Sequence, residues 1–328
     1  MKKYTDIPQF RDVVREVKLH HDYNGKDDNG NATYLHKTPY PTLKFKGTTK
    51  KHGTNSAIVK YADGRYEFQS RERILSTDED NQGFMTEMLK KDYQKLFDEI
   101  VFNDYCAIYG EWCGEGIMKG VALNKLPKMF VIFSIKIDDV YVDLENYAHL
   151  QNNEQYIYND TQFPSFEIEI DFNQPELSQN KLVELTTEVE KECPIGKYFG
   201  VSGIGEGIVW QYINGKERYI FKVKGEKHQS SKVRTLAPVN TEEIENMNAF
   251  IEYAVTESRL TQGIEKMREL GIPFDVKSTA DYLRWIYNDI IKEENDTIEK
   301  NNINIKKLGG AVSAKARLFW LNYLNTHM

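Results

Sequence analysis

The sequence predicts an α+β protein in which a strand-rich first part precedes a smaller helical part. Two hairpin signals mark the first part, the Asp-Gly pair in AIVKYADGRYEF and the Asn-Gly pair in IVWQYINGKERYIFKVK, each between β-favouring runs. Beyond the second hairpin, apolar residues such as Ile244, Met247 and Ile251 recur at helical spacing. We therefore expect an α+β domain at 1–237 and a helical domain at 238–328.

Further segments fill in these two parts. The runs DYCAIYGEW and KMFVIFSIKIDDVYVDL are rich in β-branched and aromatic residues, which predicts buried strands. GFMTEMLKKDYQKLFDEIV predicts a helix from its apolar spacing, whereas the glycine- and asparagine-rich HDYNGKDDNGNATY predicts an exposed loop. In the helical part, Ser278 followed by Asp281 predicts a helix start, and AKARLFWLNYL predicts a final helix.

Composition limits the classes of function. The 328 residues are 40% hydrophobic and 28% charged, with a net charge of -7, which fits a soluble globular protein without an overall attraction for nucleic acid. Contacts with phosphate must come from local patches such as KVKGEKHQSSKVR. Three cysteines without a CxxC pattern predict reduced thiols in the cytoplasm and exclude a cysteine-based zinc ribbon. No apolar run is long enough for a membrane span, and the first residues do not form a secretory signal.

The pattern KxxG has little value alone, because it occurs six times in this chain. Context distinguishes Lys50, in KKHGTN, which lies directly before the first predicted hairpin. Its neighbour Lys51 stands only two residues before Gly53 and does not fit the pattern. Charged and aromatic residues follow Lys50 in order: Arg71 in SRER, Glu111 in YGEWCG, Phe133 in FVIFSI, Glu206 in GEGIVW, and Lys222 and Lys224 in FKVKG.

This ordered series resembles the motifs of the covalent nucleotidyltransferases, a superfamily of RNA ligases, DNA ligases and mRNA capping enzymes. The KxHGTN form resembles the phage and kinetoplastid RNA ligase 2 family, and the stretch YAVTESRL is similar to the C-terminal domain of that family. The resemblance implies an ATP-grasp-like nucleotidyltransferase domain with antiparallel sheets, followed by a small all-helical domain.

The activity implied by the resemblance is that of an ATP-dependent RNA ligase with Mg²⁺ or Mn²⁺ as its metal ion. Such an enzyme joins 3′-hydroxyl and 5′-phosphate RNA ends through lysyl-AMP and RNA-adenylate intermediates, here in duplex or nicked RNA. The resemblance also implies a monomer in the cytoplasm, which is the host cytoplasm for a phage protein.

Each motif residue receives a role from the same resemblance. Lys50 is implied to attack ATP and carry AMP covalently, and Glu206 to bind the metal ion, for which carboxylate oxygen is suited. The family often has glutamate where Thr49 stands, which leaves a backbone contact for this position. For the nucleotide, the resemblance implies that Glu111 binds the ribose hydroxyls, that Phe133 stacks on adenine, and that Lys224 and Lys222 bind the α-phosphate and the triphosphate. Arg71 is implied to contact the ribose or the phosphate of the nucleic-acid end. Further contacts beside Lys50 are implied for Thr49, His52 and Asn55.

The chemistry sets two requirements on these residues. A lysine attacks phosphorus when it is neutral, so the pKa of Lys50 has to fall, and nearby cations with desolvation can achieve this. The second hairpin must also bring its residues to one pocket. With a two-residue turn at its Asn-Gly pair, Glu206 pairs with Val223 and faces away from Lys222 and Lys224. We therefore predict a bulge or a longer loop that moves Glu206 opposite Lys224.

Other interpretations of single residues remain open. Lys50 can be a solvated loop lysine, and Phe133 can be a core residue of its strand. His52 can serve only the loop, and Arg73 can take the role assigned to Arg71 within SRER.

Other functions also remain open. A DNA ligase or a guanylyltransferase carries a β-rich OB domain after the FKVK motif, and the helical tail argues against both. A non-catalytic RNA-binding protein on the same scaffold would have lost the lysine or the metal ligand, whereas Lys50 and Glu206 are both present.

Overall fold

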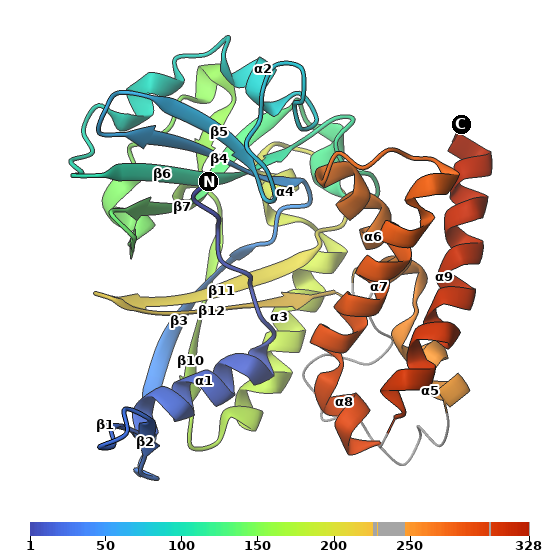
Figure 1. Ribbon diagram of the computed structural model, residues 1–328. Coiled ribbons are helices and arrows are strands. Elements are labelled where there is room, and N and C mark those ends of the chain that lie inside the picture. Colours follow the sequence, from blue (N-terminus) through green and yellow to red (C-terminus); the bar gives the residue numbers. More distant parts are fainter. Residues whose placement is uncertain (226–227, 229–246, 302, 328) are drawn as a thin grey trace. The chain divides into compact units, whose positions relative to one another are not determined.

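The chain forms two compact units, residues 1–225 and 226–328 (Figure 1). The computed structural model describes residues 1–225, 228, 247–301 and 303–327. The domain boundary that the sequence predicts, between residues 237 and 238, lies outside these described residues. Antiparallel sheets with helices form the first unit, and the regular structure described in the second unit is helical, which confirms the predicted α+β class.

A six-stranded sheet forms one half of the first unit, with the strand order β5-β4-β6-β7-β8 and with β9 beside β7. All its pairs are antiparallel except β7 with β9. Its two faces pack into separate apolar clusters, one around Ile108 and Phe130 and the other around Val59 and Tyr109. The strands are β4 (Thr54–Tyr61), β5 (Tyr66–Ser70), β6 (Tyr105–Cys113), β7 (Met129–Ile137), β8 (Val140–Val142) and β9 (Ile157–Asn159).

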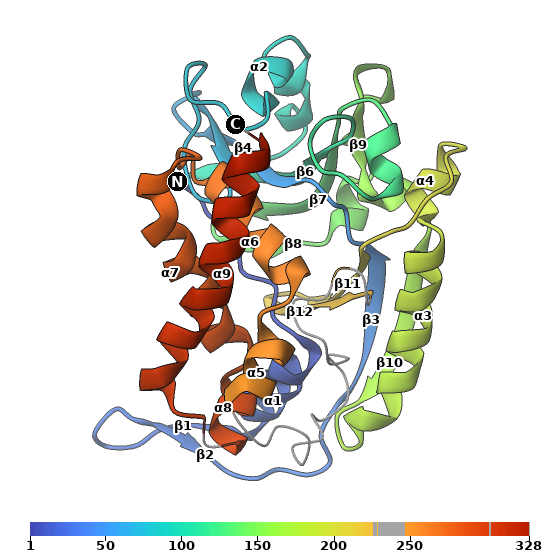
Figure 2. The ribbon, with the colours of Figure 1, turned by 90° about the vertical axis from the view of Figure 1, so that its right-hand side faces the viewer.

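A four-stranded antiparallel sheet, in the order β10-β3-β11-β12, forms the other half. Its strands are β3 (Thr42–Thr49), β10 (Ser165–Asp171), β11 (Gly207–Asn214) and β12 (Glu217–Lys224). Helix α1 (Phe10–Asp22) contacts β12, and helix α3 (Gln179–Lys191) contacts both β11 and β12 (Figure 2). A short helix, α4 (Pro194–Tyr198), follows α3. Ile220 of β12 joins the Val59 cluster, so the two sheets share part of their core.

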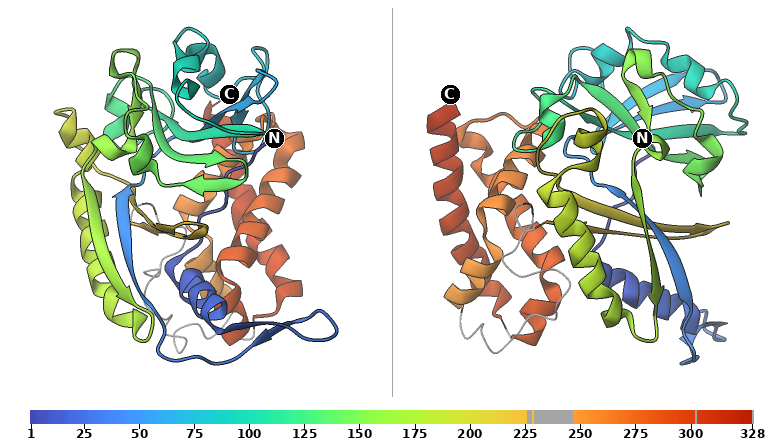
Figure 3. Two further views of the ribbon diagram at one scale, coloured as in Figure 1. Left: turned by 90° about the vertical axis from the view of Figure 1, so that its left-hand side faces the viewer. Right: turned by 180° about the vertical axis from the view of Figure 1, so that it is seen from behind.

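Two predictions about the first unit need correction. The expected loop HDYNGKDDNGNATY forms strands β1 (Tyr23–Lys26) and β2 (Ala32–Tyr34) (Figure 3), because Asp27 closes the turn by accepting from backbone amides. The expected helix of residues 83–101 is broken into α2 (Phe84–Met88) and a 3₁₀ turn (Tyr93–Phe97). Tyr93 is five positions after Met88, which would place the two residues about 140° apart around one continuous helix. The break allows both side chains to be buried in one cluster.

The second unit has its own core. Tyr282 and Trp320 stack in it with ring centroids 4.7 Å apart. Arg259, from YAVTESRL, is fully buried and donates to Asp289 at 2.8 Å and to Glu294 at 3.0 Å. The helices are α5 (Met247–Ala254), α6 (Glu257–Glu269), α7 (Thr279–Glu293), which starts directly after Ser278 as predicted, α8 (Asn295–Lys300) and α9 (Ile305–His327).

Candidate nucleotidyltransferase site

The loop at residues 50–53 connects β3 of one sheet to β4 of the other. The backbone amide of Lys50 donates to the Gly207 carbonyl at 2.8 Å, which continues the pairing of β3 with β11. Gly53 lies against β6, where a Cβ would come within 2.3 Å of the Trp112 carbonyl oxygen. The glycine of KxxG is therefore required by the close approach of two backbones.

Glu206 gathers three of the predicted residues around one carboxylate. Its side chain is 3% exposed. One oxygen, Oε2, contacts Lys50 Nζ at 2.9 Å and His52 Nδ1 at 3.0 Å, and the other, Oε1, contacts Lys224 Nζ at 3.2 Å. The four residues come from the loop, from the residue before β11 and from the end of β12. A buried carboxylate that contacts two lysines and a histidine is a site built for charge rather than for packing.

The pKa values in this cluster follow from burial and from the shared carboxylate. Burial alone would raise the pKa of Glu206, but the charges of Lys50, Lys224 and His52 hold it well below its ordinary value. Burial lowers the pKa of Lys50, but Glu206 and Glu111 outweigh it and raise the pKa overall. For Lys224, burial outweighs the attraction of Glu206, so its pKa is lowered. The expected fall in the pKa of Lys50 is therefore not found while its amine contacts Glu206.

The β11–β12 hairpin brings Glu206 next to Lys224 without the bulge or longer loop that we predicted. Asn214 pairs with Glu217, so the two-residue turn is displaced by one position, and the pairing continues regularly to Gly207 opposite Lys224. Glu206 precedes the strand, and its carbonyl accepts from the Gly225 amide at 2.9 Å. Because it stands outside the strand, the alternation of side chains does not direct it away from Lys224.

Glu111 and Asn55 lie directly opposite each other in the pairing of β6 with β4. The Glu111 side chain is partly buried, and its Oε1 accepts from the Gly53 amide at 3.1 Å. Burial raises the pKa of Glu111 to about 7, although the charge of Lys50 opposes this. Glu111 thus holds the loop of the predicted nucleophile and also contributes to its electrostatic field.

The two arginines of SRER have different surroundings. Arg71 forms an ion pair with Asp6, and its charge lowers the pKa of Lys50. The guanidinium of Arg73 donates to loop carbonyls, including that of Asp80 at 2.9 Å. Arg73 therefore holds the loop that follows it, and the charge of Arg71 acts on Lys50.

Phe133 packs as a core residue and also remains partly accessible. It is the extra residue of a bulge in β7, because Ile132 and Ser134 have partners in β6 and Phe133 does not. Its ring meets that of Tyr4 edge-on, with centroids 5.1 Å apart. Tyr4 is 5% exposed, and its hydroxyl accepts from Arg218 at 2.7 Å. We did not predict Tyr4 as part of this region, since a lone tyrosine in KKYTDI carries no motif signal.

Thr49 and Lys222 occupy strand positions beside the cluster. Thr49 ends β3 opposite Ile208 and is 1% exposed; its hydroxyl has no hydrogen-bond partner in the part of the chain that the structure describes. Lys222 is two residues from Lys224 on β12, and its charge contributes to the lowered pKa of Lys224. Its backbone amide donates to the Pro8 carbonyl at 3.0 Å, which ties the N-terminal segment to β12.

Lys51 has a partner that the sequence did not reveal. Its side chain is 5% exposed and forms an ion pair with Asp160, which is 4% exposed. The two residues are 109 positions apart, so no local pattern connects them.

One buried carboxylate, that of Glu206, could bind a divalent cation together with substrate phosphates. Among the described residues, no group of three or more His, Cys, Asp or Glu side chains could hold a metal ion. Glu206 nevertheless supplies a buried, ionised carboxylate next to three nitrogen atoms that can hold phosphate. Mg²⁺ is suited to such a site, because it uses one or two protein carboxylates and completes its coordination with substrate phosphates and water.

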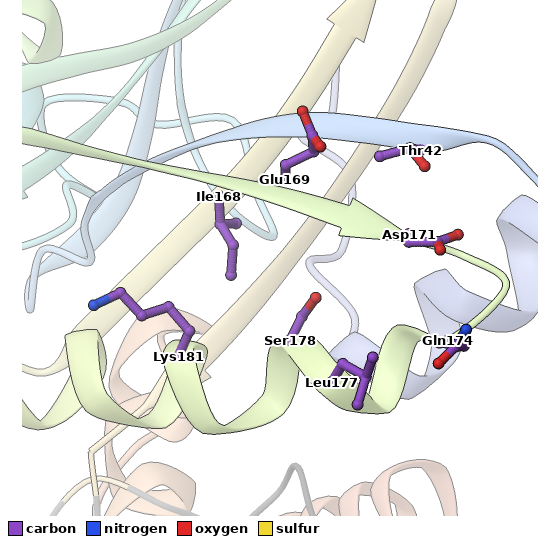
Figure 4. Close-up of a pocket in the computed structure, with 8 residues that line it drawn as sticks. All are labelled: Thr42, Ile168, Glu169, Asp171, Gln174, Leu177, Ser178 and Lys181. Atoms are coloured by element: carbon purple, nitrogen blue, oxygen red, sulfur yellow. The ribbon is translucent and has the colours of Figure 1, made fainter.

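A separate hollow of about 460 Å³ lies between β10, the start of β3 and the start of α3 (Figure 4). It is lined by Thr42, Ile168, Glu169, Asp171, Gln174, Leu177, Ser178 and Lys181. Thr42 begins β3 and Lys50 directly follows its last residue, which places them roughly 25 Å apart along the strand direction. The hollow contains none of the predicted site residues and is distinct from the Glu206 cluster.

Comparisons with known proteins place these observations in a family. The family model described as RNA ligase matches residues 44–224. Comparison with curated proteins gives no match. Among the helices that the structure describes, none is both long and apolar enough to cross a membrane.

Solved structures of a Naegleria gruberi RNA ligase are similar to this chain at low identity. A mutant with AMP and Mn is 16% identical with a TM-score of 0.46, covering 69% of this chain and 56% of that one. The same ligase with PPi is 17% identical with a TM-score of 0.43, covering 68% and 56%. This chain therefore matches little more than half of the length of those structures. The assignment rests on the family model, whose match extends over more than half of this chain and contains every residue of the Glu206 cluster. The chain belongs to the RNA ligase family.

Proposed function

We propose that this protein is an ATP-dependent RNA ligase of the RNA ligase 2 type that uses Lys50 as its nucleophile. The observation that carries the proposal is the contact of the Glu206 carboxylate with Lys50, His52 and Lys224. Residues far apart in the chain, which the motif order selected for nucleotidyl transfer, meet around one charge. A solvated loop lysine would have no reason to be held in this way.

The proposed reaction has three steps. The Lys50 amine attacks the α-phosphorus of ATP, forming a phosphorus–nitrogen bond as the bond to pyrophosphate breaks. The 5′-phosphate of RNA then attacks the lysyl-AMP, which forms a diphosphate linkage to AMP and releases the lysine. Finally, the 3′-hydroxyl of the other RNA end attacks the 5′-phosphate, a phosphodiester forms, and AMP leaves.

The charges of the site residues suggest a role for each of them in the first step, the attack of Lys50 on ATP. Glu206 raises the pKa of Lys50 while the two are in contact, so engagement of that carboxylate elsewhere would favour the neutral, nucleophilic amine. Glu206 is the residue that would hold Mg²⁺ or Mn²⁺, and the charge of that ion would stabilise the phosphates and lower the pKa of a nearby amine. Lys222 and Lys224 then hold the phosphates as they become more negative.

The other site residues would bind the nucleotide and the RNA end. Glu111 lies at the loop of Lys50 and accepts hydrogen bonds, which suits the ribose hydroxyls. The bulge turns Phe133 out of the regular pleat, so its accessible part suits adenine. Arg71 suits the ribose or the phosphate of the RNA end, because its guanidinium is a strong phosphate donor. The remaining loop contacts proposed for the nucleotide or the incoming strand come from Thr49, His52 and Asn55.

A sealing assay tests this proposal. Purified protein, ATP and Mg²⁺ are incubated with a nicked RNA duplex that has a 3′-hydroxyl and a labelled 5′-phosphate at the nick. We expect a sealed product with ATP and none with Lys50→Ala, while Lys44→Ala, an exposed β3 lysine paired with Glu167 at 2.8 Å, keeps its activity. Sealing of DNA but not RNA, or labelling by GTP in place of ATP, would move the protein to the DNA ligases or the capping enzymes. Binding without any transfer would make it a non-catalytic RNA-binding protein.

A further inference from the structure

The side chain directly after the proposed nucleophile is buried and charged. Lys51 and Asp160 are 5% and 4% exposed, and they form an ion pair. Removing two charges from water is costly, and a good partner only offsets that cost. A lysine is rarely buried at an ordinary loop position, so this pair needs an account beyond stability.

Among the described residues, Lys51 is the side chain that pairs with the buried Asp160 carboxylate. The Asp160 Oδ2 takes the ion pair, and its Oδ1 has no hydrogen-bond partner in the described part of the chain. Asp160 begins the turn after β9, and β9 pairs with β7 of the six-stranded sheet. The Asp160 carboxylate is therefore positioned by regular secondary structure, and it can hold the Lys51 side chain in place.

The loop of residues 50–53 is anchored at each of its successive positions. The Lys50 amide is held by Gly207 at 2.8 Å, and the Gly53 amide by Glu111 at 3.1 Å. Between them, the side chain of Lys51 is held by its ion pair with Asp160, and the side chain of His52 is held by Glu206. Lys50 and His52 both contact Glu206, while Lys51, which lies between them, has a different partner. This arrangement sets the backbone from which the Lys50 side chain extends.

We propose that the Lys51–Asp160 ion pair is a positioning device that fixes Lys50 for attack on the α-phosphorus. The inference rests on the proposed function, because it concerns the first step of that reaction. Nucleophilic attack requires the reacting atoms to be held within a narrow range of distance and direction, and a shift of 1 Å can cost a factor of about 100 in rate. Lys51 acts here through its neighbour and does not touch the reacting atoms.

A role for Lys51 as a cation that lowers the pKa of Lys50 predicts a different behaviour. The Asp160 carboxylate compensates the Lys51 charge, so the pair as a whole has little field at Lys50. Positioning changes the rate of attack at every pH, whereas loss of a field moves the pH at which the rate rises. The pH profile therefore separates the two.

The experiment compares the rate of covalent AMP transfer in four full-length variants. Lys51→Met leaves the carboxylate unpaired, Lys51→Met/Asp160→Leu removes both charges and keeps an apolar pair, and Lys51→Arg keeps the charge with a different reach. Lys46→Met is the matched control, because Lys46 pairs with Glu145 on an exposed part of β3. Rates are measured with labelled ATP and Mg²⁺ at several ATP concentrations and pH values, at a temperature well below each thermal midpoint.

We expect Lys51→Met to be unstable and the double variant to fold, with a maximal rate roughly 100-fold below wild type. Its KM for ATP should stay within about 3-fold of wild type, and the midpoint of its pH profile should not move. Lys51→Arg should lie between wild type and the double variant, and the Lys46→Met control should match wild type.

Three results would overturn the inference. They are a folded double variant with the wild-type rate, a double variant that loses only affinity for ATP, and a shifted pH midpoint. If the double variant does not fold, Lys51→Arg decides, because a wild-type rate in that variant contradicts a geometric role. Absence of any covalent AMP on the wild-type protein is a different result, since it overturns the proposed function itself.

Discussion

Glu206 shows how one buried residue can determine the state of several others. Its carboxylate holds Lys50, His52 and Lys224 within 3.2 Å. The contact raises the pKa of Lys50 and so favours the protonated form of the proposed nucleophile. The residue that we propose as the metal ligand is therefore also the one that raises the pKa of the proposed nucleophile.

Substituting Glu206 tests this electrostatic control. In Glu206→Gln the carboxylate charge is lost, so the pKa of Lys50 should fall. The pH dependence of Lys50 acetylation by a small anhydride, followed by mass spectrometry without nucleotide or metal, measures this change. Glu167→Gln is the control, with its exposed partner Lys44 as the reporter. An unchanged acetylation profile for Lys50 would contradict the charge coupling.

Glu111 predicts a specific dependence of stability on pH. Its pKa is raised from an ordinary 4.5 to about 7, so the folded protein keeps a proton that the unfolded chain releases between these values. The free energy of unfolding should therefore fall as the pH rises through this window. Glu111→Gln removes this loss and should stabilise the protein relative to wild type by about 1–3 kcal/mol at pH 8 and hardly at pH 4. Urea unfolding at both pH values measures it, and a difference that is equal at both would contradict the raised pKa.

At the scale of elements, the turn of the β11–β12 hairpin sets the strand register and thereby the position of Glu206 relative to Lys224. Gly215 takes the first central position of the turn with φ at +60°, and Asn214 remains in the strand. This places Gly207 opposite Lys224 and leaves Glu206 just outside the strand. A shift of the turn by a single position thus decides which residues share the pocket.

Gly207 is the position at which this hairpin is most sensitive. A Cβ there would lie 2.2 Å from the Val223 carbonyl oxygen, and its φ is +151°. Gly207→Ala should destabilise the protein by about 2–4 kcal/mol and slow covalent AMP transfer, because the backbone beside Glu206 must move. Gly215→Asn is the control, since asparagine tolerates the left-handed region and a Cβ there meets nothing within 4 Å. Thermal unfolding and labelling measure both effects, and equal behaviour of the two variants would contradict this account.

The sequence predicted those elements whose signals are local. The Asn-Gly pair indicated the second hairpin and Ser278 indicated the start of α7, and both exist. The turn position was wrong by one residue, because Asn-Gly fits more than one register and long-range packing chooses between them. The ion pair of Lys51 with Asp160 and the contact of Tyr4 with Phe133 were not predicted, because each joins segments more than 100 residues apart. Motif order selected Lys50 and Glu206, but only the fold shows their contact.

At the scale of the whole molecule, the proposed site belongs to one unit. Every residue assigned to it lies within residues 1–225, and this unit also contains the family match at 44–224. The second unit has a separate core and a buried arginine network around Arg259. We propose that the first unit carries out nucleotidyl transfer and that the helical unit contributes to the sealing of RNA.

A fragment of residues 1–237 tests this division. It should form the covalent AMP adduct within about 10-fold of the full-length rate, because the charges that act on Lys50 are all retained. Its sealing of nicked RNA should fall far more. Parallel labelling and sealing assays on the fragment and the whole chain measure the two activities. Equal losses in both assays would show that the two units do not divide the work in this way.

The most direct test of the central claim is to locate the covalent AMP. The protein is incubated with ATP and Mg²⁺, denatured and digested, and the modified peptide is sequenced by tandem mass spectrometry. The account predicts AMP on Lys50 in the peptide region KFKGTTKKHGTN, with none on its neighbour Lys51. AMP on Lys51 or on any lysine other than Lys50 would contradict it, as would the absence of an adduct on protein that has been shown to be folded.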